Sequence, residues 1–171
     1  MKPPIQYLLR VIAYCIIFLA STFNAFAQNW DQIIKVTAQN NDGSSARNAN
    51  DLYGNAVSIS GNYAIVGAFH EGEDPNGLNS VGNAGAVYIL YNDSGSWVQV
   101  KKITVPVRDV GDNFGNSVSI SGNYAIVSAD QEDDDAQETN TLDNSGSAYI
   151  FKKDWGGPDN WGLVKKITAS T

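Results

Sequence analysis

The sequence predicts an all-β fold that contains two complete four-stranded repeats and one extra strand. Residues 47–68 align without a gap with residues 108–129 at an offset of 61, and 15 of these 22 positions are identical. Such internal self-similarity is typical of repeat architectures. In each copy, short apolar runs are separated by turn residues, and no segment after residue 27 has helical periodicity of useful length. The repeating unit is therefore a set of short strands.

The first two strands of each repeat are predicted to form a tight hairpin. In residues 56–60, Val57 and Ile59 alternate with serine, which is the pattern of a strand with one buried face. Gly61-Asn62 follows, and both residues accept the positive φ of a two-residue turn. Residues 63–68 are nearly all apolar, so we expect this second strand to be buried on both faces.

Two further strands complete each repeat. Residues 86–91 form the third predicted strand, and Trp97–Thr104 forms the fourth. The fourth element occurs three times, because Trp30–Thr37 and Trp161–Thr168 resemble it. The expected units are repeat 1 at about 47–104, repeat 2 at about 108–168 and an orphan outer strand at 30–37.

The first 27 residues have the layout of a secretory signal peptide. Lys2 and Arg10 precede an apolar run from Val11 to Ala20, and Ala25-Phe26-Ala27 supplies the small residues of a cleavage site. Because the run is too short to span a bilayer comfortably, we expect cleavage after Ala27 rather than a membrane anchor. Residues 28–171 would then be exported to the medium or the cell surface, without a membrane span.

The net charge argues against one class of partner. The chain has 18 acidic and 11 basic residues, a formal net charge of −7, and loss of the two basic residues of the leader would make the charge −9. Proteins that bind nucleic acids use Lys and Arg to neutralise phosphates. We therefore expect no nucleic-acid partner.

Four antiparallel strands repeated at about 60 residues resemble the blade of a β-propeller. The motifs resemble those of the FG-GAP repeat family, whose repeats also form the headpiece of integrin α subunits. The resemblance spans nearly all of residues 30–168, and it implies a partial propeller with a role in binding or adhesion. Ser128 departs from the family pattern, which has Gly there. The matching pairs are Tyr53-Gly54, Phe114-Gly115, Gly67-Ala68 and Ser128-Ala129.

The resemblance does not extend to the calcium loop of integrin-type repeats. In those repeats, the pattern Asp-x-Asp-x-Asp-Gly-x-x-Asp lies between the first two strands and supplies oxygen ligands. Here the same place holds only Ser60-Gly61-Asn62 and Ser121-Gly122-Asn123. We therefore expect no calcium ion in these turns.

Two repeats are too few to close a propeller, which needs about four to eight blades. Open terminal sheets would expose apolar faces and favour association. Three arrangements are compatible with the sequence. The chain is part of a longer protein that supplies further blades, it closes a ring by homo-oligomerising, or it is an open two-blade array.

Alternating strand directions place the long loops at one end of the blades. The loops after the second strands, 69–84 and 130–145, emerge there with the connection between the repeats. We expect a protein or glycan ligand at a cell surface to bind this end, because binding residues concentrate on loops that a rigid scaffold holds. In the first loop, the candidate contact residues are His70, Glu71, Glu73 and Asp74.

The second long loop carries seven carboxylates in 16 residues and no basic residue. Two interpretations remain open: a solvated acidic loop that water and salt screen, or a Ca²⁺ site. The spacing of the acids matches no defined coordination loop. The candidate calcium ligands are Asp130, Glu132, Asp133, Asp134 and Asp135.

Arg47 and Arg108 occupy equivalent positions of the two repeats. Because function rarely needs one residue in every blade, we expect a scaffold role for both. Each would form an ion pair within its loop or donate hydrogen bonds to carbonyls of the connection that precedes the first strand.

Little in the sequence supports catalysis. His70 is the only histidine, so the chain has no histidine cluster for a metal, and the sequence around His70 indicates no partners for a Ser-His-Asp triad. We therefore expect a secreted or cell-surface, non-catalytic module for binding or adhesion. Two alternatives remain: a calcium-dependent carbohydrate-binding module, and a structural spacer in a larger surface protein.

Overall fold

The structure of the protein is a computed structural model that describes residues 34–139 and 141–169. These residues belong to one compact unit that begins at Ile34. The expected signal peptide at 1–27 and residues 30–33 of the expected orphan strand lie outside the described residues. Residues 34–37, the rest of that element, form no strand. The described ranges contain no helix, and hence no helix that could cross a membrane.

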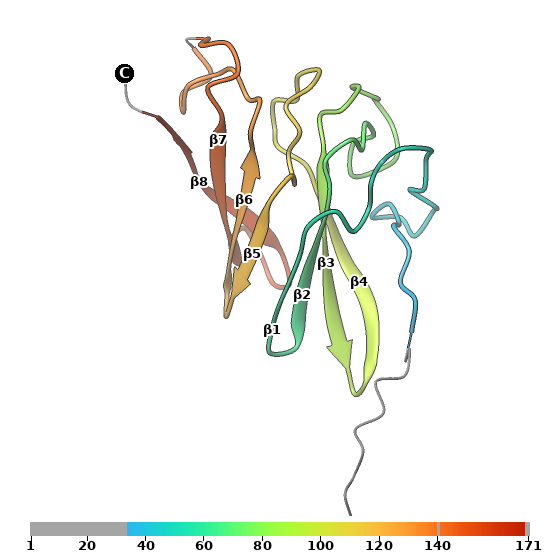
Figure 1. The fold of residues 1–171 in the computed structure, drawn as a ribbon. Coiled ribbons are helices and arrows are strands. Elements are labelled where there is room, and N and C mark those ends of the chain that lie inside the picture. Colours follow the sequence, from blue (N-terminus) through green and yellow to red (C-terminus); the bar gives the residue numbers. More distant parts are fainter. Residues whose placement is uncertain (1–33, 140, 170–171) are drawn as a thin grey trace, which may run out of the picture. The chain divides into compact units, whose positions relative to one another are not determined.

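Two four-stranded antiparallel sheets make up the fold, as the sequence predicts, and they do not close into a ring (Figure 1). In each sheet, strands that follow one another in the chain are neighbours. We call the sheets blade 1 and blade 2. Blade 1 contains β1 (Val57–Ser60), β2 (Tyr63–Ala68), β3 (Ala86–Asp93) and β4 (Ser96–Ile103). Blade 2 contains β5 (Val118–Ser121), β6 (Tyr124–Ala129), β7 (Ser147–Lys153) and β8 (Trp161–Thr168).

The two blades share irregularities as well as strand order. The pairing of β3 with β4 shifts register between Ile89 and Leu90. The pairing of β7 with β8 shifts at the equivalent place, between Ile150 and Phe151. Because a bulge bends and twists a strand locally, its recurrence shows that the sequence repeat is also a repeat of backbone structure.

A two-residue turn joins the first two strands of each blade. Gly61 and Gly122 have positive φ angles of 56° and 53°, whereas Asn62 and Asn123 do not have positive φ. A positive φ at the first turn residue alone is typical of a type II′ turn. The expected tight hairpin is therefore confirmed, but only its glycine uses the left-handed conformation.

The most enclosed strand is β3, in which residues 86–90 are all buried. In β6, by contrast, Tyr124 and Ile126 are exposed while Ala125 and Val127 are buried. The expectation that the second strand is buried on both faces is therefore wrong for blade 2. The physical reason is that only one face of blade 2 is covered among the described residues, whereas Ala38 and Ala46 also pack against the other face of blade 1.

The main hydrophobic core lies between the two sheets. Phe114 precedes β5 and is fully buried, and its ring contacts the rings of Tyr149 and Phe151. From blade 1, Ile65 and Val87 belong to the same cluster. Burial of this apolar surface holds the blades together. The cluster also includes Ile89, Ile103, Val105, Ile120, Ala125, Val127, Ala129 and Trp161.

Main-chain contacts join blade 2 to the loop that precedes β3. Asn113 N donates a hydrogen bond to Asn83 O, and Phe114 N donates one to Ala84 O, both at 3.0 Å. Gly85 forms an isolated parallel bridge with Phe114. Gly85 has a φ of 89°, and a Cβ at this position would overlap the backbone of Phe114. The absence of a side chain at Gly85 therefore allows the two blades to approach closely.

The long connections gather at one end of the blades, while the β1–β2 and β3–β4 turns lie at the other end (Figure 1). This is the placement that alternating strand directions predict. We call this end the loop face. It consists of the β2–β3 loop (69–85), the β4–β5 connection (104–117) and the β6–β7 loop (130–146).

Candidate functional site

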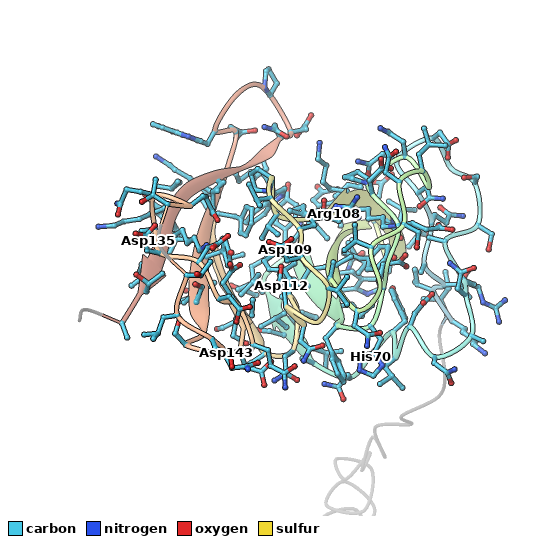
Figure 2. The ribbon with its side chains drawn as sticks, turned by 90° about the horizontal axis from the view of Figure 1, so that it is seen from above. His70, Arg108, Asp109, Asp112, Asp135 and Asp143 are labelled. Atoms are coloured by element: carbon cyan, nitrogen blue, oxygen red, sulfur yellow. The ribbon has the colours of Figure 1, made fainter. Side chains whose placement is uncertain are left out.

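The loop face carries the residues that the sequence proposes for binding. Figure 2 looks down onto this face and labels ionisable side chains from all three of its segments. His70 belongs to the β2–β3 loop, and Asp135 and Asp143 belong to the β6–β7 loop. The β4–β5 connection contributes Arg108, Asp109 and Asp112.

A buried ion pair anchors the β2–β3 loop to blade 1. Glu71 is fully buried, and its carboxylate accepts a hydrogen bond from Tyr88 Oη at 2.8 Å. Lys102 Nζ lies 3.4 Å from Glu71 Oε1 and donates to Asn40 Oδ1 at 2.9 Å. Glu73 N donates to Glu71 Oε1 at 2.9 Å. Both buried charges are thus paired and hydrogen-bonded, as burial away from water requires.

Blade 2 contains the same network around Glu132. Tyr149 Oη donates to Glu132 Oε2, and Lys166 Nζ lies 3.1 Å from Glu132 Oε1. Asp134 N donates to that carboxylate, and Lys166 Nζ also donates to Glu138 Oε1 at 2.9 Å. Burial and the adjacent carboxylate raise the pKa of Tyr149 far above its ordinary range. The phenol therefore stays protonated and remains a hydrogen-bond donor.

Beyond this anchor, the two long loops have the same pattern of main-chain hydrogen bonds. Two bonds close each loop, and the residues bonded in the second loop lie 61 positions after those bonded in the first. The bonds are Val81 N to Gly72 O and Gly85 N to Glu71 O in the first loop, and Leu142 N to Asp133 O and Gly146 N to Glu132 O in the second.

The loops differ in charge on this common framework. Three glycines of the first loop correspond to three acids of the second. The corresponding pairs are Gly72 and Asp133, Gly77 and Glu138, and Gly82 and Asp143. The backbone of the two loops is therefore similar, while the surface that each presents to a partner is not.

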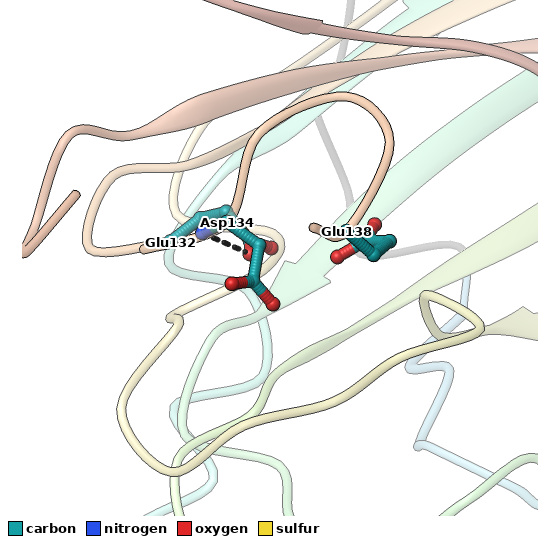
Figure 3. A group of neighbouring side chains, drawn as sticks. All are labelled: Glu132, Asp134 and Glu138. Atoms are coloured by element: carbon teal, nitrogen blue, oxygen red, sulfur yellow. Dashed lines mark hydrogen bonds between the residues drawn. The ribbon is translucent and has the colours of Figure 1, made fainter. Parts of the chain in front are cut away.

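Three carboxylates of the second loop lie close together (Figure 3). One oxygen from each of Glu132, Asp134 and Glu138 lies within 4.8 Å of the others. Lys166 places its ammonium beside Glu132 and Glu138, so a cation of the protein already neutralises part of this group. Of the five calcium ligands that the sequence proposes, Glu132 and Asp134 belong to the group, and Glu138 was not among the five.

The other three proposed calcium ligands lie outside this group. Asp133 Oδ1 accepts a hydrogen bond from Asn144 N at 2.6 Å. Asp135 Oδ1 accepts one from Thr139 N at 3.0 Å, within its own turn. Asp130 is exposed. The structure therefore brings only part of the acidic run together.

The four proposed contact residues of the first loop have different surroundings. Glu71 is enclosed in the buried network and does not reach the surface. His70 and Glu73 are partly exposed. Asp74 is also partly exposed, and its Oδ1 accepts a hydrogen bond from Leu78 N at 3.0 Å, which lowers the pKa of the Asp74 carboxyl. His70, Glu73 and Asp74 can therefore meet a partner, whereas Glu71 supports the loop from below.

Arg108 connects the two blades. Its Nη1 donates to Gly72 O at 2.9 Å and its Nη2 donates to Asn79 O at 2.6 Å. The guanidinium binds main-chain carbonyls, but they belong to the long loop of the preceding blade, so the expectation that the partners lie in the connection that carries Arg108 is wrong. For the equivalent Arg47, the described part of the chain contains no side-chain hydrogen bond or ion pair.

A buried aspartate supports each connection to a first strand. Asp112 is 3% exposed, and its Oδ2 accepts a hydrogen bond from Asp109 N at 2.8 Å. Burial, together with the negative charge of Glu132, raises the pKa of Asp112 to about 6. In blade 1, Asp51 accepts a hydrogen bond from Asn48 N at 2.7 Å, and burial likewise raises the pKa of Asp51.

A hollow of about 340 Å³ opens beside blade 1 at the loop face. It is lined by residues 35–38, by parts of 46–53, and by Glu71 and Tyr88. Tyr53 belongs to this lining, and its buried hydroxyl has no hydrogen-bond partner among the residues that the structure describes. The equivalent position of blade 2 is Phe114, whose surroundings are filled by blade 1.

Sequence reasoning missed the lysines that pair with the buried glutamates. A signal was present, because Lys102 and Lys166 occupy the same position of the recurring fourth strand. Glu71 and Glu132 also recur, at the offset of 61. Two opposite charges that recur together indicate an ion pair of the scaffold, and this pattern could have separated the two glutamates from the exposed acids around them.

Comparison with known proteins agrees with the repeated geometry. The profile of the FG-GAP repeat matches residues 30–91 and 97–151, which is more than half of the chain. The matched segments contain β1, β2 and most of β3 and β4 in blade 1, and β5, β6 and most of β7 in blade 2. A comparison with curated proteins finds no match.

Proposed function

Because this chain belongs to the FG-GAP repeat family, we propose that it is a secreted or cell-surface module for binding or adhesion, with the loop face as its contact surface. The observation that carries the proposal is the contrast between the two long loops. A buried glutamate–lysine pair anchors each loop, but the second loop carries more exposed acidic residues than the first. Loops of variable surface on a rigid scaffold are a common basis for recognition.

The β6–β7 loop indicates the chemistry of the partner. Asp130 and Asp143 are exposed, Asp133 and Asp134 are partly exposed, and the segment 130–146 contains no basic residue. Such a concentration of one charge attracts a partner of opposite charge and speeds its association at low salt. We therefore favour a protein with a lysine- or arginine-rich surface as the ligand.

The proposal is tested by binding of the purified chain to immobilised probes of defined charge. The probes are a lysine-rich peptide, a glutamate-rich peptide of equal length and an array of neutral and acidic glycans. We expect binding to the lysine-rich peptide that weakens as salt rises, because exposed charges are screened over about 8 to 10 Å at physiological ionic strength.

A matched pair of variants locates the contact. Asp143→Asn removes one exposed charge from the β6–β7 loop of blade 2, and Asp93→Asn removes one at the β3–β4 turn of blade 1, which lies at the end away from the loop face. We expect only Asp143→Asn to weaken binding. Equal effects of the two variants would contradict a role for the loop face. A well-folded chain that binds no probe would instead favour a structural spacer.

A further inference from the structure

Each blade has two different faces, and the contact between the blades uses one of each kind. We call them the leading face and the trailing face. The leading face bears Val57 and Ile59 in blade 1, and Val118 and Ile120 in blade 2. The trailing face bears Tyr63 and Ile65 in blade 1, and Tyr124 and Ile126 in blade 2. Within the chain, the trailing face of blade 1 covers the leading face of blade 2.

At β1 and β6 the two remaining faces are exposed copies of the surfaces that meet, whereas Tyr88 on the leading face of blade 1 is already buried against Ala38 and Ala46 of the same chain. Ile120 is 5% exposed where blade 1 covers it, whereas the equivalent Ile59 on the leading face of blade 1 is 65% exposed. Ile65 is 0% exposed under blade 2, whereas the equivalent Ile126 on the trailing face of blade 2 is 44% exposed. The side chains in each pair are identical and lie at the same register, so they differ only in whether a second blade covers them.

The trailing face of blade 2 is also hollowed and mostly apolar. It contains a shallow hollow of about 520 Å³. Tyr124, Ile126 and Ile150 line the hollow together with Ser119 and Ser121. Exposed apolar patches of this kind are typical of protein interaction sites.

Polar groups of the internal contact recur at both exposed faces. Ser58 Oγ accepts a hydrogen bond from Ile120 N and Ser60 Oγ accepts one from Gly122 N, each at 3.2 Å. The equivalent acceptors on the trailing face of blade 2 are Ser119 and Ser121, and both are exposed. The equivalent donors on the leading face of blade 1 are the main-chain N–H groups of Ile59 and Gly61.

We propose that the trailing face of blade 2 binds the leading face of blade 1 of a second copy of this chain. The contact would repeat the one already present between blades 1 and 2 of a single chain. It joins two different surfaces, so it is heterologous, and successive copies form either a closed ring or an open array. The proposal is independent of what the loop face binds.

The loop face would contribute to the same contact. Within the chain, Arg108 donates to Gly72 O across the blade boundary. In the second copy, the equivalent donor is Arg47, and the equivalent acceptor on blade 2 is the carbonyl of Asp133. In the assembly, the Arg47 guanidinium would therefore donate to a loop carbonyl of the neighbouring copy, as the Arg108 guanidinium does to Gly72 O within one chain.

One position of the trailing face does not match. Gly67 lies against the carbonyl of Gly115, and a Cβ at Gly67 would overlap that oxygen. The equivalent of Gly67 in blade 2 is Ser128, and the equivalent of Gly115 in an incoming copy is Gly54. The Ser128 side chain therefore holds the second copy back from the closest approach, and the structure assigns to Ser128 the control of how tightly copies associate.

Sedimentation velocity over a range of concentrations tests the proposal on the purified chain. We expect the wild-type chain to associate as its concentration rises. Ser128→Gly should tighten this association by about tenfold or more, since it removes the side chain that would meet the backbone of Gly54 in the incoming copy. Within the chain, the lost Ser128 Oγ accepts a hydrogen bond from Ser117 N at 2.9 Å. The control is Leu78→Asp, which adds a charge at an exposed residue of the β2–β3 loop, away from both faces, and should leave association unchanged.

A mixing experiment tests the head-to-tail geometry. Ile59→Asp places a charge on the leading face only, and Ile126→Asp places one on the trailing face only. Each variant alone should be monomeric, because every contact in its assembly needs both faces. The two variants together should form one-to-one dimers and nothing larger, because each retains the face that the other has lost.

Two outcomes would overturn the proposal. The first is that the wild-type chain and the Ser128→Gly chain both stay monomeric at every concentration. That result would mean that these faces do not bind a second copy of this chain. The second is association that persists in Ile59→Asp and Ile126→Asp alone, which would place the contact on a different surface. Both substitutions replace exposed side chains, so we expect both variants to fold. Circular dichroism checks this expectation.

Discussion

The carbonyl oxygen of Gly115 occupies the space that a side chain at Gly67 would need. Gly115 follows Phe114 just before blade 2, and Gly67 precedes Ala68 at the end of β2 in blade 1. The Phe-Gly pair of one blade thus meets the Gly-Ala pair of the blade before it. The two motifs lie far apart in the sequence, and the structure shows that they form a single close contact between sheets.

This contact predicts that Gly67 is intolerant of the smallest side chain. We expect Gly67→Ala to lower the free energy of unfolding by about 1–3 kcal/mol, because the added methyl group overlaps a backbone oxygen that is held by the sheet. Gly82→Ala is the matched control, since a Cβ there meets no atom within 4 Å. Urea denaturation followed by tryptophan fluorescence gives both values. Equal losses in the two variants would refute the steric argument.

The two buried ion pairs should respond unequally to loss of the glutamate. Glu71→Gln leaves Lys102 buried without a carboxylate, and removal of one partner from a buried pair costs about 3–5 kcal/mol. Glu132→Gln should cost less, because Lys166 keeps Glu138 at 2.9 Å. Thermal and urea unfolding of the two variants measure the difference. The opposite order would show that Glu138 does not compensate for Glu132.

Loss of Arg108 should destabilise the contact between the blades. Arg108→Ala removes two hydrogen bonds that a charged side chain donates to main-chain carbonyls. A hydrogen bond of this kind contributes about 1.5–3 kcal/mol to the free energy of unfolding. The matched variant is Arg47→Ala, for which we expect a change within about 0.5 kcal/mol in dilute, monomeric protein. Urea denaturation at low protein concentration compares them, and a similar loss in both would show that Arg47 has an equivalent role within one chain.

Asp112 should make stability fall as the pH rises through the mildly acidic range. Its pKa is about 6 in the folded protein and about 3.9 in an unfolded chain, so the folded state holds the proton more tightly between these values. The contribution is therefore present below about pH 4 and is lost as the pH approaches and passes 6. The total is at most about 3 kcal/mol, since one pKa unit corresponds to about 1.4 kcal/mol.

Asp112→Asn isolates this effect from the other titrating groups. Asparagine keeps an oxygen that can accept the Asp109 N–H, but it does not ionise. The unfolding free energy of the variant relative to the wild type should rise between pH 4 and pH 6 and then level off. Urea denaturation at closely spaced pH values provides the measurement, and a constant difference across this range would argue against a buried, titrating Asp112.

Calcium should leave the stability of the wild-type chain unchanged. The Lys166 ammonium already lies beside two of the three clustered carboxylates, so a second cation would meet both repulsion and incomplete ligation. Melting temperatures measured in excess calcium and in excess chelator should therefore agree. A higher melting temperature in calcium would instead support the calcium-dependent carbohydrate-binding alternative.

Much of the fold could be predicted because its signals are local. Alternation of Val57 and Ile59 with serine, and the glycine of the Gly61-Asn62 turn, depend on neighbouring residues only. Within the two repeats, the expected and observed strands agree to within two residues at their ends, whereas residues 34–37 of the expected orphan strand form no strand. The third strand, for example, was expected at 86–91 and runs from Ala86 to Asp93.

The candidate site could be predicted only in part. In the sequence, the acids of the β6–β7 loop are equivalent members of one acidic run. In the structure, Glu132 is buried against Tyr149 and Lys166, while Asp130 is exposed. The distinction depends on residues that are 17 and more positions away, because the bond to Tyr149 spans 17 residues and the lysine lies on the last strand. Local charge density carries no information about such partners.

By itself, the sequence determined the strands, the turns, the repeat and the end of the blades at which the long loops emerge, because period-two alternation and turn chemistry act over a few residues. Only the tertiary structure decided which face of each sheet is covered. Alternation places Ile59 and Ile120 on equivalent faces, but one is exposed and the other is buried. Burial is a property of the neighbouring blade, and equivalent residues have different neighbours at the two ends of an array.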